Sequence, residues 1–176
     1  PLSKHDLRKH LCHCSRHVIA ISKRCYEHVI AGGICAENVT RIDDAVDCDS
    51  FRPDPDAENC LRNEYKLTNE VLVAIVGRIG PFKKQFIFAE AARLVLGRNT
   101  NVRFLIIGDT QDDRYLARIT SFLKEHNLQQ QVLFTGWRDN MPAILRSLDI
   151  LVSLSGGSVL FEGMAAGKAV LAAGDY

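Results

Sequence analysis

The sequence lacks an excess of charge of either sign, because its 22 Lys and Arg residues nearly balance its 21 Asp and Glu residues. The net charge of +1 therefore gives no reason to expect a nucleic acid as partner. No apolar run approaches the roughly 18–20 residues that a membrane-spanning helix requires. The first residues, Pro-Leu-Ser-Lys-His, contain no apolar core of the kind found in secretory signals. With 47% hydrophobic residues, the chain can still bury a substantial core.

Cysteine is absent beyond residue 60, so all six cysteines lie in roughly the first third of the chain. A disulfide scaffold would distribute them through the fold and is typical of smaller secreted domains. We therefore expect reduced thiols in a cytoplasmic protein. The segment His10-Leu-Cys-His-Cys-Ser-Arg-His17 places His and Cys one helical turn apart. Zinc sites usually take a second ligand pair from a distant segment, and no second pair is evident, so we predict no metal site.

From Val71 onward, short apolar runs typical of buried strands alternate with helical patterns. The patterns predict strands at 71–76, 102–107, 132–134, 150–153 and 169–172, and helices at 83–96, 112–126, 140–147 and 158–166. This alternation predicts a doubly wound α/β domain, in which a parallel sheet carries helices on both faces as in the Rossmann fold. Upstream, we expect strands at 18–21 and 39–42, a helix between Ser22 and Gly32, and an acidic, turn-rich loop at 43–56.

The most informative segment is the strand–turn–helix–strand unit from Ile150 to Leu171, whose turn reads Ser155-Gly156-Gly157-Ser158. Because this turn has no bulky side chain, the amides at the start of the next helix can face an anionic ligand. Glu162 follows one helical turn after Ser158, on the same face. A phosphate at the helix start and a carboxylate one turn deeper suit a nucleotide, whose ribose hydroxyls need an acceptor. The alternatives are that Glu162 forms a structural salt bridge or that it lies on a locally exposed face of the helix.

Several segments, in order, resemble the donor-binding half of glycosyltransferase family 4, which comprises retaining enzymes with two Rossmann domains. Val39-Thr-Arg-Ile-Asp-Asp-Ala-Val-Asp47, followed by Phe51-Arg-Pro53, resembles the crossing between the domains, V-x-x-I-P-N-G-V-D … F-x-P. Val76-Gly-Arg-Ile-Gly-Pro-Phe-Lys-Lys84 resembles V-G-R-L-x-x-x-K-G. Glu162-Gly-Met-Ala-Ala-Gly-Lys-Ala-Val170 resembles E-A-M-A-x-G-x-P-V. Shorter similarities lie at 18–22 (last strand of the acceptor domain), 104–109 (F-x-I-x-G-D-G) and 132–137 (V-x-F-x-G).

The resemblance implies the GT-B fold and transfer of a sugar from a nucleotide diphosphate sugar to a sugar or lipid-linked acceptor, in polysaccharide or glycolipid biosynthesis. Residues 1–52 would be the end of the acceptor domain and the crossing, and residues 53–176 the donor domain without its C-terminal end. We therefore expect the isolated chain to be inactive, the acceptor to bind through the missing domain, and any peripheral membrane contact to involve that domain. No metal or other cofactor is expected.

The resemblance assigns catalysis to Arg78 and Lys83, as cations that stabilise the charge developing on the β-phosphate when the donor sugar leaves. Both follow the first long strand, at the carboxyl edge where doubly wound sheets bind ligands. The resemblance also places Glu162 at the ribose hydroxyls and residues 136–138 near the nucleobase. The predicted donor-binding residues are Gly77, Gly108, Gly136, Trp137, Arg138, Gly157, Ser158, Val159 and Glu162. The alternatives are that Lys83 is a solvated surface charge and that Trp137 only packs the domain edge.

The chain departs from the family pattern at three places. Asp43-Asp44-Ala45 replaces Pro-Asn-Gly, and Ala169 replaces the proline of G-x-P-V. The family usually has another glutamate eight positions before Glu162, where this chain has Leu154. The loss of that glutamate favours an alternative function, a non-catalytic nucleotide-sugar-binding domain. A sugar-nucleotide epimerase would share the sheet, but it does not predict the G-R-x-x-x-x-K signature.

Overall fold

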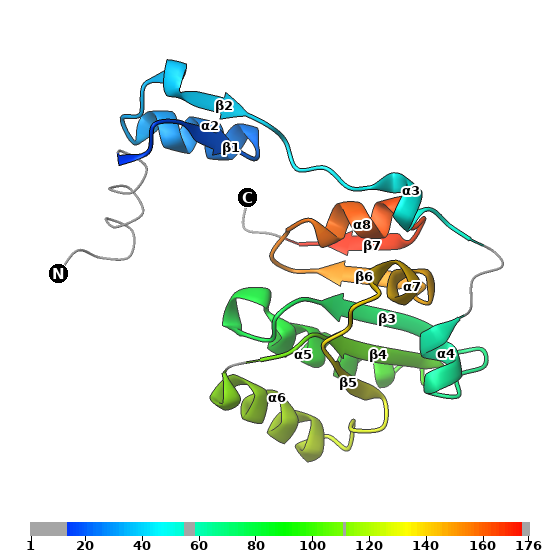
Figure 1. Cartoon of the computed structure of the whole chain (residues 1–176). Helices are drawn as coiled ribbons and strands as arrows, with labels where there is room; N and C mark the ends of the chain where they lie inside the picture. The colour runs from blue at the N-terminus through cyan, green and yellow to red at the C-terminus, as the bar shows by residue number, and fades with distance from the viewer. Residues whose placement is uncertain (1–13, 55–58, 111, 174–176) are drawn as a thin grey trace. The chain divides into compact units, whose positions relative to one another are not determined.

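A computed structural model describes residues 14–54, 59–110 and 112–173 of the chain (Figure 1). The chain divides into two compact units, Pro1–Ala45 and Val46–Tyr176. The boundary between residues 52 and 53 concerns the domains of the resembled family and stays a prediction. No helix within the described ranges is long and apolar enough to cross a bilayer.

The first unit contains a small parallel βαβ arrangement. Its elements are β1 (Val18–Ala20), α2 (Lys23–Ala31), the 3-10 helix η1 (Ala36–Asn38) and β2 (Val39–Arg41). The side chain of Ser22 accepts a hydrogen bond from the amide of Cys25 at 3.1 Å, and α2 ends at Gly32, as the sequence predicts. His17 Nε2 pairs with Thr40 Oγ1 at 2.8 Å. The residues 10–13 of the considered zinc motif lie outside the described ranges.

The second unit is built on a five-stranded parallel sheet in the order β5-β4-β3-β6-β7. The strands are β3 (Val71–Val76), β4 (Val102–Ile107), β5 (Val132–Gly136), β6 (Ile150–Ser153) and β7 (Ala169–Ala172). Strand β5 extends beyond its predicted end at Phe134, because an irregularity in register lets Gly136 pair with Ile107. The chain winds outward from β3 to β5 and then returns to the other side of β3, so the winding direction reverses between β3 and β6.

Helices cover both faces of this sheet, as Figure 1 shows. Helices α5 (Gln85–Leu96) and α6 (Asp113–Glu125) pack on one face, and α4 (Cys60–Glu64), α7 (Met141–Arg146) and α8 (Val159–Ala165) on the other. Consecutive residues of β3 enter opposite cores: Val73 joins the α5 side and Ala74 the α7 side, because strand side chains alternate. The predicted doubly wound α/β fold is confirmed.

Four short helices of the described residues are not predicted by the sequence analysis. The acidic segment predicted as a loop contains α3 (Cys48–Phe51), whose start is capped by the Asp47 carboxylate accepting from the amides of Asp49 and Ser50. The others are α4 and the 3-10 helices η1 and η2 (Pro81–Lys83). A single helical turn holds too few residues to display the apolar period from which helices are predicted.

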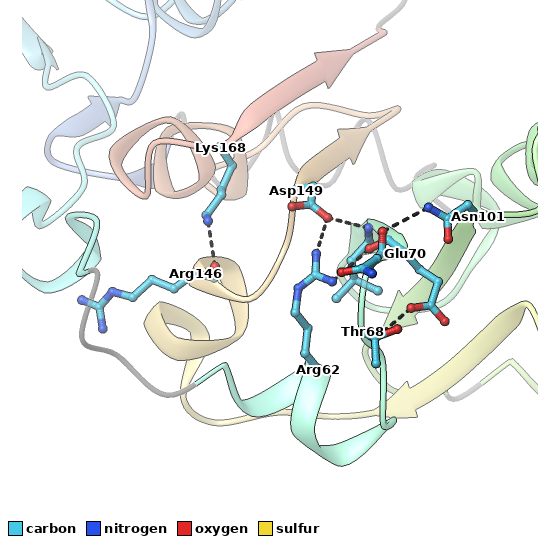
Figure 2. Close-up of polar contacts among 9 residues, drawn as sticks. Arg62, Thr68, Glu70, Asn101, Arg146, Asp149 and Lys168 are labelled. Atoms are coloured by element: carbon cyan, nitrogen blue, oxygen red, sulfur yellow. Dashed lines mark hydrogen bonds and ion pairs between the residues drawn. The ribbon is translucent and has the colours of Figure 1, made fainter.

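Polar contacts fasten the amino-terminal edge of the sheet, where β3 and β6 begin (Figure 2). Asp149 Oδ2 accepts from Arg62 Nη2 at 2.5 Å and from the amide of Leu72 at 2.7 Å. Arg62 also donates to the carbonyl oxygen of Glu70 at 2.9 Å. These bonds join α4, β3 and the start of β6, which sets the register of the strands that lead to the opposite edge.

At the carboxyl edge, the loops after β3 and β4 touch through their backbones. Gly108 has φ of +142°, and a Cβ there would lie 2.2 Å from the carbonyl oxygen of Gly77. The amide of Gly77 donates to the carbonyl oxygen of Ile107 at 2.9 Å, and that of Gly108 to Gly136 at 3.0 Å. Three neighbouring strands therefore end in glycines whose backbones adjoin.

Gly108→Ala is expected to lower the free energy of unfolding by about 3 kcal/mol or more, because it adds a backbone clash to an unfavourable φ. Gly80→Ala is the matched control, since Gly80 is extended at φ 177° and a Cβ there meets nothing within 4 Å. The control should be neutral or stabilising by up to about 1 kcal/mol. Urea unfolding followed by circular dichroism measures both, and equal effects would contradict the backbone contact as the cause.

Candidate functional site

The site lies where the winding reverses, at the carboxyl ends of β3 and β6. Ligands of doubly wound sheets bind outside the strand ends at this reversal. The loop after β3 carries Arg78 and Lys83, and the turn after β6 carries Gly156, Gly157 and Ser158. Two predicted groups of residues, far apart in sequence, therefore belong to adjacent strand ends.

Lys83 joins the two loops. Its aliphatic chain lies over Gly77, where a Cβ would be 3.3 Å from Lys83 Cε. Its Nζ is 3.5 Å from the carbonyl oxygen of Gly156, and a Cβ on Gly157 would also lie 3.5 Å from Nζ. The side chain is half-buried. A cation is therefore held at the turn after β6, rather than extending freely into solvent as the surface alternative requires.

The turn after β6 leaves amides available beside this cation. Gly156 and Gly157 have φ of 69° and 109°, which glycine adopts readily. Within the described residues, the amides of Gly157, Ser158 and Val159 donate to no acceptor. Unpaired amides next to an ammonium group make a positively polarised concavity that suits an anion.

Glu162 lies one turn into α8 and is half-buried. Among the residues that the structure describes, its carboxylate has no hydrogen-bond or ion-pair partner, so the salt-bridge alternative finds no support there. Helix α8 lies very close to β6, because a Cβ on the buried Gly163 would be only 2.4 Å from Leu151 Cδ2. Leu154, at the position of the family's other glutamate, packs against the core on the α5 side.

Arg78 is exposed, and its side chain has no partner among the described residues. Its backbone, by contrast, is held by Gln85, a residue that the sequence analysis missed. Gln85 is fully buried, and its Nε2 donates to the carbonyl oxygen of Arg78 at 3.0 Å. The available signal was an amide on the otherwise apolar buried face of α5, one turn before Phe88 and Ala89.

Trp137 and Arg138 follow β5 and differ in their surroundings. The Trp137 side chain is 68% exposed, so it packs little against the domain. The Arg138 guanidinium forms two hydrogen bonds with the Glu64 carboxylate of α4, at 2.9 and 2.6 Å, and a third with Tyr65 Oη at 3.3 Å. The Arg138 bonds hold the pKa of Glu64 below its usual value, against the opposing effect of burial. Arg138 thus ties its loop to α4, and its assignment to the nucleobase stays a prediction.

Clusters of three or more His, Cys, Asp or Glu side chains that could hold a metal ion are not found in the described ranges. The groups described at the winding reversal are the amides, the cations and the carboxylate named above. Together they can bind an anionic group at the reversal point and present an acceptor one helical turn away.

A comparison with protein families identifies the chain's relatives. Residues 70–174 match the family described as Glycosyl transferases group 1. The chain belongs to this family. It is 30% identical over 132 residues to the Escherichia coli UDP-Gal:alpha-D-GlcNAc-diphosphoundecaprenol alpha-1,3-galactosyltransferase, a match that covers 72% of the chain and 32% of that protein. The chain thus spans about a third of the length of the curated relatives that it matches.

Two solved structures have folds similar to that of this chain. The Anabaena Alr3699/HepE structure in complex with UDP and glucose has a TM-score of 0.85 and 25% identity, covering 98% of this chain and 50% of that one. The C-terminal domain of a group 1 glycosyl transferase family protein (LpcC) from Francisella tularensis has a TM-score of 0.64 and 27% identity, covering 73% of this chain and 70% of that one.

Glu64→Gln is expected to lower stability at pH 7 by at most about 1 kcal/mol, because the pair with Arg138 is partly exposed. Since the folded-state pKa of Glu64 is lowered, its contribution is present above the unfolded pKa of about 4.3 and is lost as the pH falls through the folded pKa. Urea unfolding at pH 7 should therefore separate variant and wild type, and the gap should narrow as the pH falls below about 4.3. The exposed Glu90→Gln serves as control; a gap that persists in acid would mean that the lost charge is not its cause.

Proposed function

We propose that this chain is the donor-binding part of a retaining glycosyltransferase of family 4, corresponding to the C-terminal half of such an enzyme. The observation that carries the proposal is Lys83, whose Nζ lies beside the turn of Gly156 and Gly157 at the winding reversal. The family match supports a transferase, and the similarity to the LpcC C-terminal domain supports the assignment to the C-terminal half.

In this proposal the donor's diphosphate lies against the turn of Gly157, Ser158 and Val159, with Lys83 and Arg78 as its cations. The bond between the sugar's anomeric carbon and the β-phosphate oxygen breaks, the oxygen of the acceptor's hydroxyl group bonds to that carbon, and the hydroxyl proton passes to the leaving diphosphate. Charge then develops on the leaving nucleoside diphosphate, which the cations and amides stabilise without a metal ion. Preorganised groups of this kind need no rearrangement during the reaction.

In this proposal the ribose and the base of the nucleotide extend from the diphosphate along the carboxyl edge of the sheet. Glu162 would accept hydrogen bonds from the ribose, and the exposed Trp137 would stack on the base beside Gly136. Gly77 and Gly108 would line the donor site with backbone, because the places of their side chains are taken by Lys83 and by the Gly77 carbonyl group. The UDP complex of the Alr3699/HepE protein supports a nucleoside diphosphate in this fold.

The acceptor would bind through the remainder of a longer protein. The E. coli relative acts on a sugar attached to diphosphoundecaprenol, which supports a sugar or lipid-linked acceptor and a place in glycolipid or polysaccharide synthesis. We infer a cytoplasmic protein, with any peripheral membrane contact made by that remainder. A second candidate is a non-catalytic nucleotide-sugar-binding domain, favoured by Leu154, which packs into the core where the family has a glutamate. Sugar transfer by the full-length protein, as opposed to binding alone, discriminates between the two.

Lys83→Ala and Arg78→Ala are each expected to weaken nucleoside diphosphate binding by about tenfold or more, because charge-assisted phosphate contacts are the strong ones. Arg78→Lys should restore binding only in part, since the planar guanidinium fork is lost. Calorimetric titration of the chain with UDP, GDP and ADP measures the effect, and the exposed Lys124→Ala is the control. Wild-type affinity in both alanine variants would place the phosphate site elsewhere.

Glu162→Gln is expected to lower nucleoside diphosphate affinity by about 1–2 kcal/mol, the difference between charged and neutral hydrogen bonds. Binding of inorganic pyrophosphate should barely change, because pyrophosphate has no ribose. The same titrations measure both ligands. Equal loss of both, or of neither, would show that this carboxylate has a structural role.

A further inference from the structure

Gln85 is a fully buried amide whose every polar atom is directed at one loop. Its Nε2 donates to the carbonyl oxygen of Arg78 at 3.0 Å and lies 3.5 Å from that of Gly77. Its Oε1 accepts from the amide of Gly80 at 3.2 Å. One side chain thus contacts three of the four residues that join β3 to η2.

A core-filling role does not account for this residue. The other buried residues of α5 are Phe88, Ala89, Ala92 and Leu96, all apolar. An amide is costly to bury unless it is hydrogen-bonded, and a methionine of similar volume would fill the same space. The amide is therefore explained by the loop it contacts rather than by the core that surrounds it.

The contacts of Gln85 control both the shape and the polarity of the loop. The amide of Gly80 donates to Gln85 Oε1, and its carbonyl oxygen accepts from the amide of Lys83 at 3.0 Å. Gly80 therefore links Gln85 to the 3-10 helix that carries the lysine. The carbonyl oxygens of Gly77 and Arg78 carry partial negative charge, and Nε2 provides them with a donor inside the protein. Carbonyl groups left without that donor would reorient, and any that turned toward Lys83 and the turn after β6 would repel a diphosphate bound there.

We propose that Gln85 is a positioning residue for the donor's diphosphate. It holds the backbone of Gly77, Arg78 and Gly80 so that Lys83 reaches the turn after β6 and the carbonyl oxygens stay away from the phosphates. This inference rests on the proposed function, because it takes the anion at the winding reversal to be the diphosphate of a nucleotide sugar.

The test compares Gln85→Met, which keeps the volume and removes the amide, with Gln130→Met, an exposed glutamine changed in the same way. The 176-residue chain is titrated with UDP, GDP, ADP and inorganic pyrophosphate, and circular dichroism checks the fold. Gln85→Met should lose about tenfold or more in affinity for the nucleoside diphosphate that wild type binds, and a similar factor for pyrophosphate. Gln130→Met should bind both as wild type does.

Gln85→Glu supplies a readout that a merely structural role would not change. When protonated, its carboxyl group can donate to the Arg78 carbonyl oxygen and accept from Gly80, as glutamine does. When ionised, it has no donor and adds a negative charge near the phosphates. The ratio of variant to wild-type affinity should therefore fall as the pH rises from about 6 to 9, since burial shifts carboxyl titration upward into this range. Using the ratio cancels titration of the phosphates themselves.

The outcomes separate this inference from the function on which it rests. If wild type binds none of the nucleotides, the proposed function fails and the inference with it. If wild type binds and a folded Gln85→Met matches it, or loses nucleotide affinity while keeping pyrophosphate affinity, only the inference is overturned. Should Gln85→Met not fold, Gln85→Glu decides, and a ratio that does not change with pH overturns the proposal.

Discussion

The central strand β3 is the element on which the rest of the second unit depends. It pairs with β4 on one side and β6 on the other, and its residues alternate between two separate apolar cores. Its amino end is fastened by Asp149, which accepts from both Leu72 and Arg62. Because one strand is fixed on both edges and both faces, the loop at its carboxyl end starts from a rigid point. A site built on that loop needs little further ordering when a ligand binds.

Contacts with the neighbouring strand ends also restrict the movement of the loop after β3, which carries part of the site. Gly108 adjoins the carbonyl group of Gly77, which ties the loop after β3 to the end of β4. On the other side, Lys83 lies against Gly77 and ends at Gly156, which ties the same loop to the turn after β6. The glycines serve for different reasons: a Cβ on Gly108 would meet the backbone of Gly77, and a Cβ on Gly77 would meet the Lys83 side chain. A Cβ on Gly156 would meet nothing within 4 Å, but its φ of 69° is one that glycine adopts readily. Lys83 is thus the long side chain that bridges the loop after β3 and the turn after β6.

The parts of the fold that the sequence predicts well are those that repeat a pattern over many residues. The strand Val71–Val76 is apolar throughout because both faces are buried, and its bounds agree with the structure. Single-turn elements such as α3 are missed, since Asp47 caps a helix too short to show a period. Within the site, Lys83 and Gly157 are predicted as separate motifs, and only the strand order brings them together. The pairing of Arg138 with Glu64 joins residues far apart in sequence, which no local pattern reveals.

Two polar residues near the site differ in their hydrogen bonding, one on the otherwise apolar buried face of α5 and the other in α8. Gln85, in α5, has its donor and its acceptor satisfied by the loop after β3. Glu162, in α8, is half-buried and has no partner for its carboxylate among the described residues. Its carboxylate is therefore free to accept hydrogen bonds from groups outside these residues. The sequence presents Gln85 as one of several polar residues of α5, beside Glu90 and Arg93. Its hydrogen bonds assign Gln85 to the scaffold of the site, whereas the ribose contact of Glu162 stays a prediction.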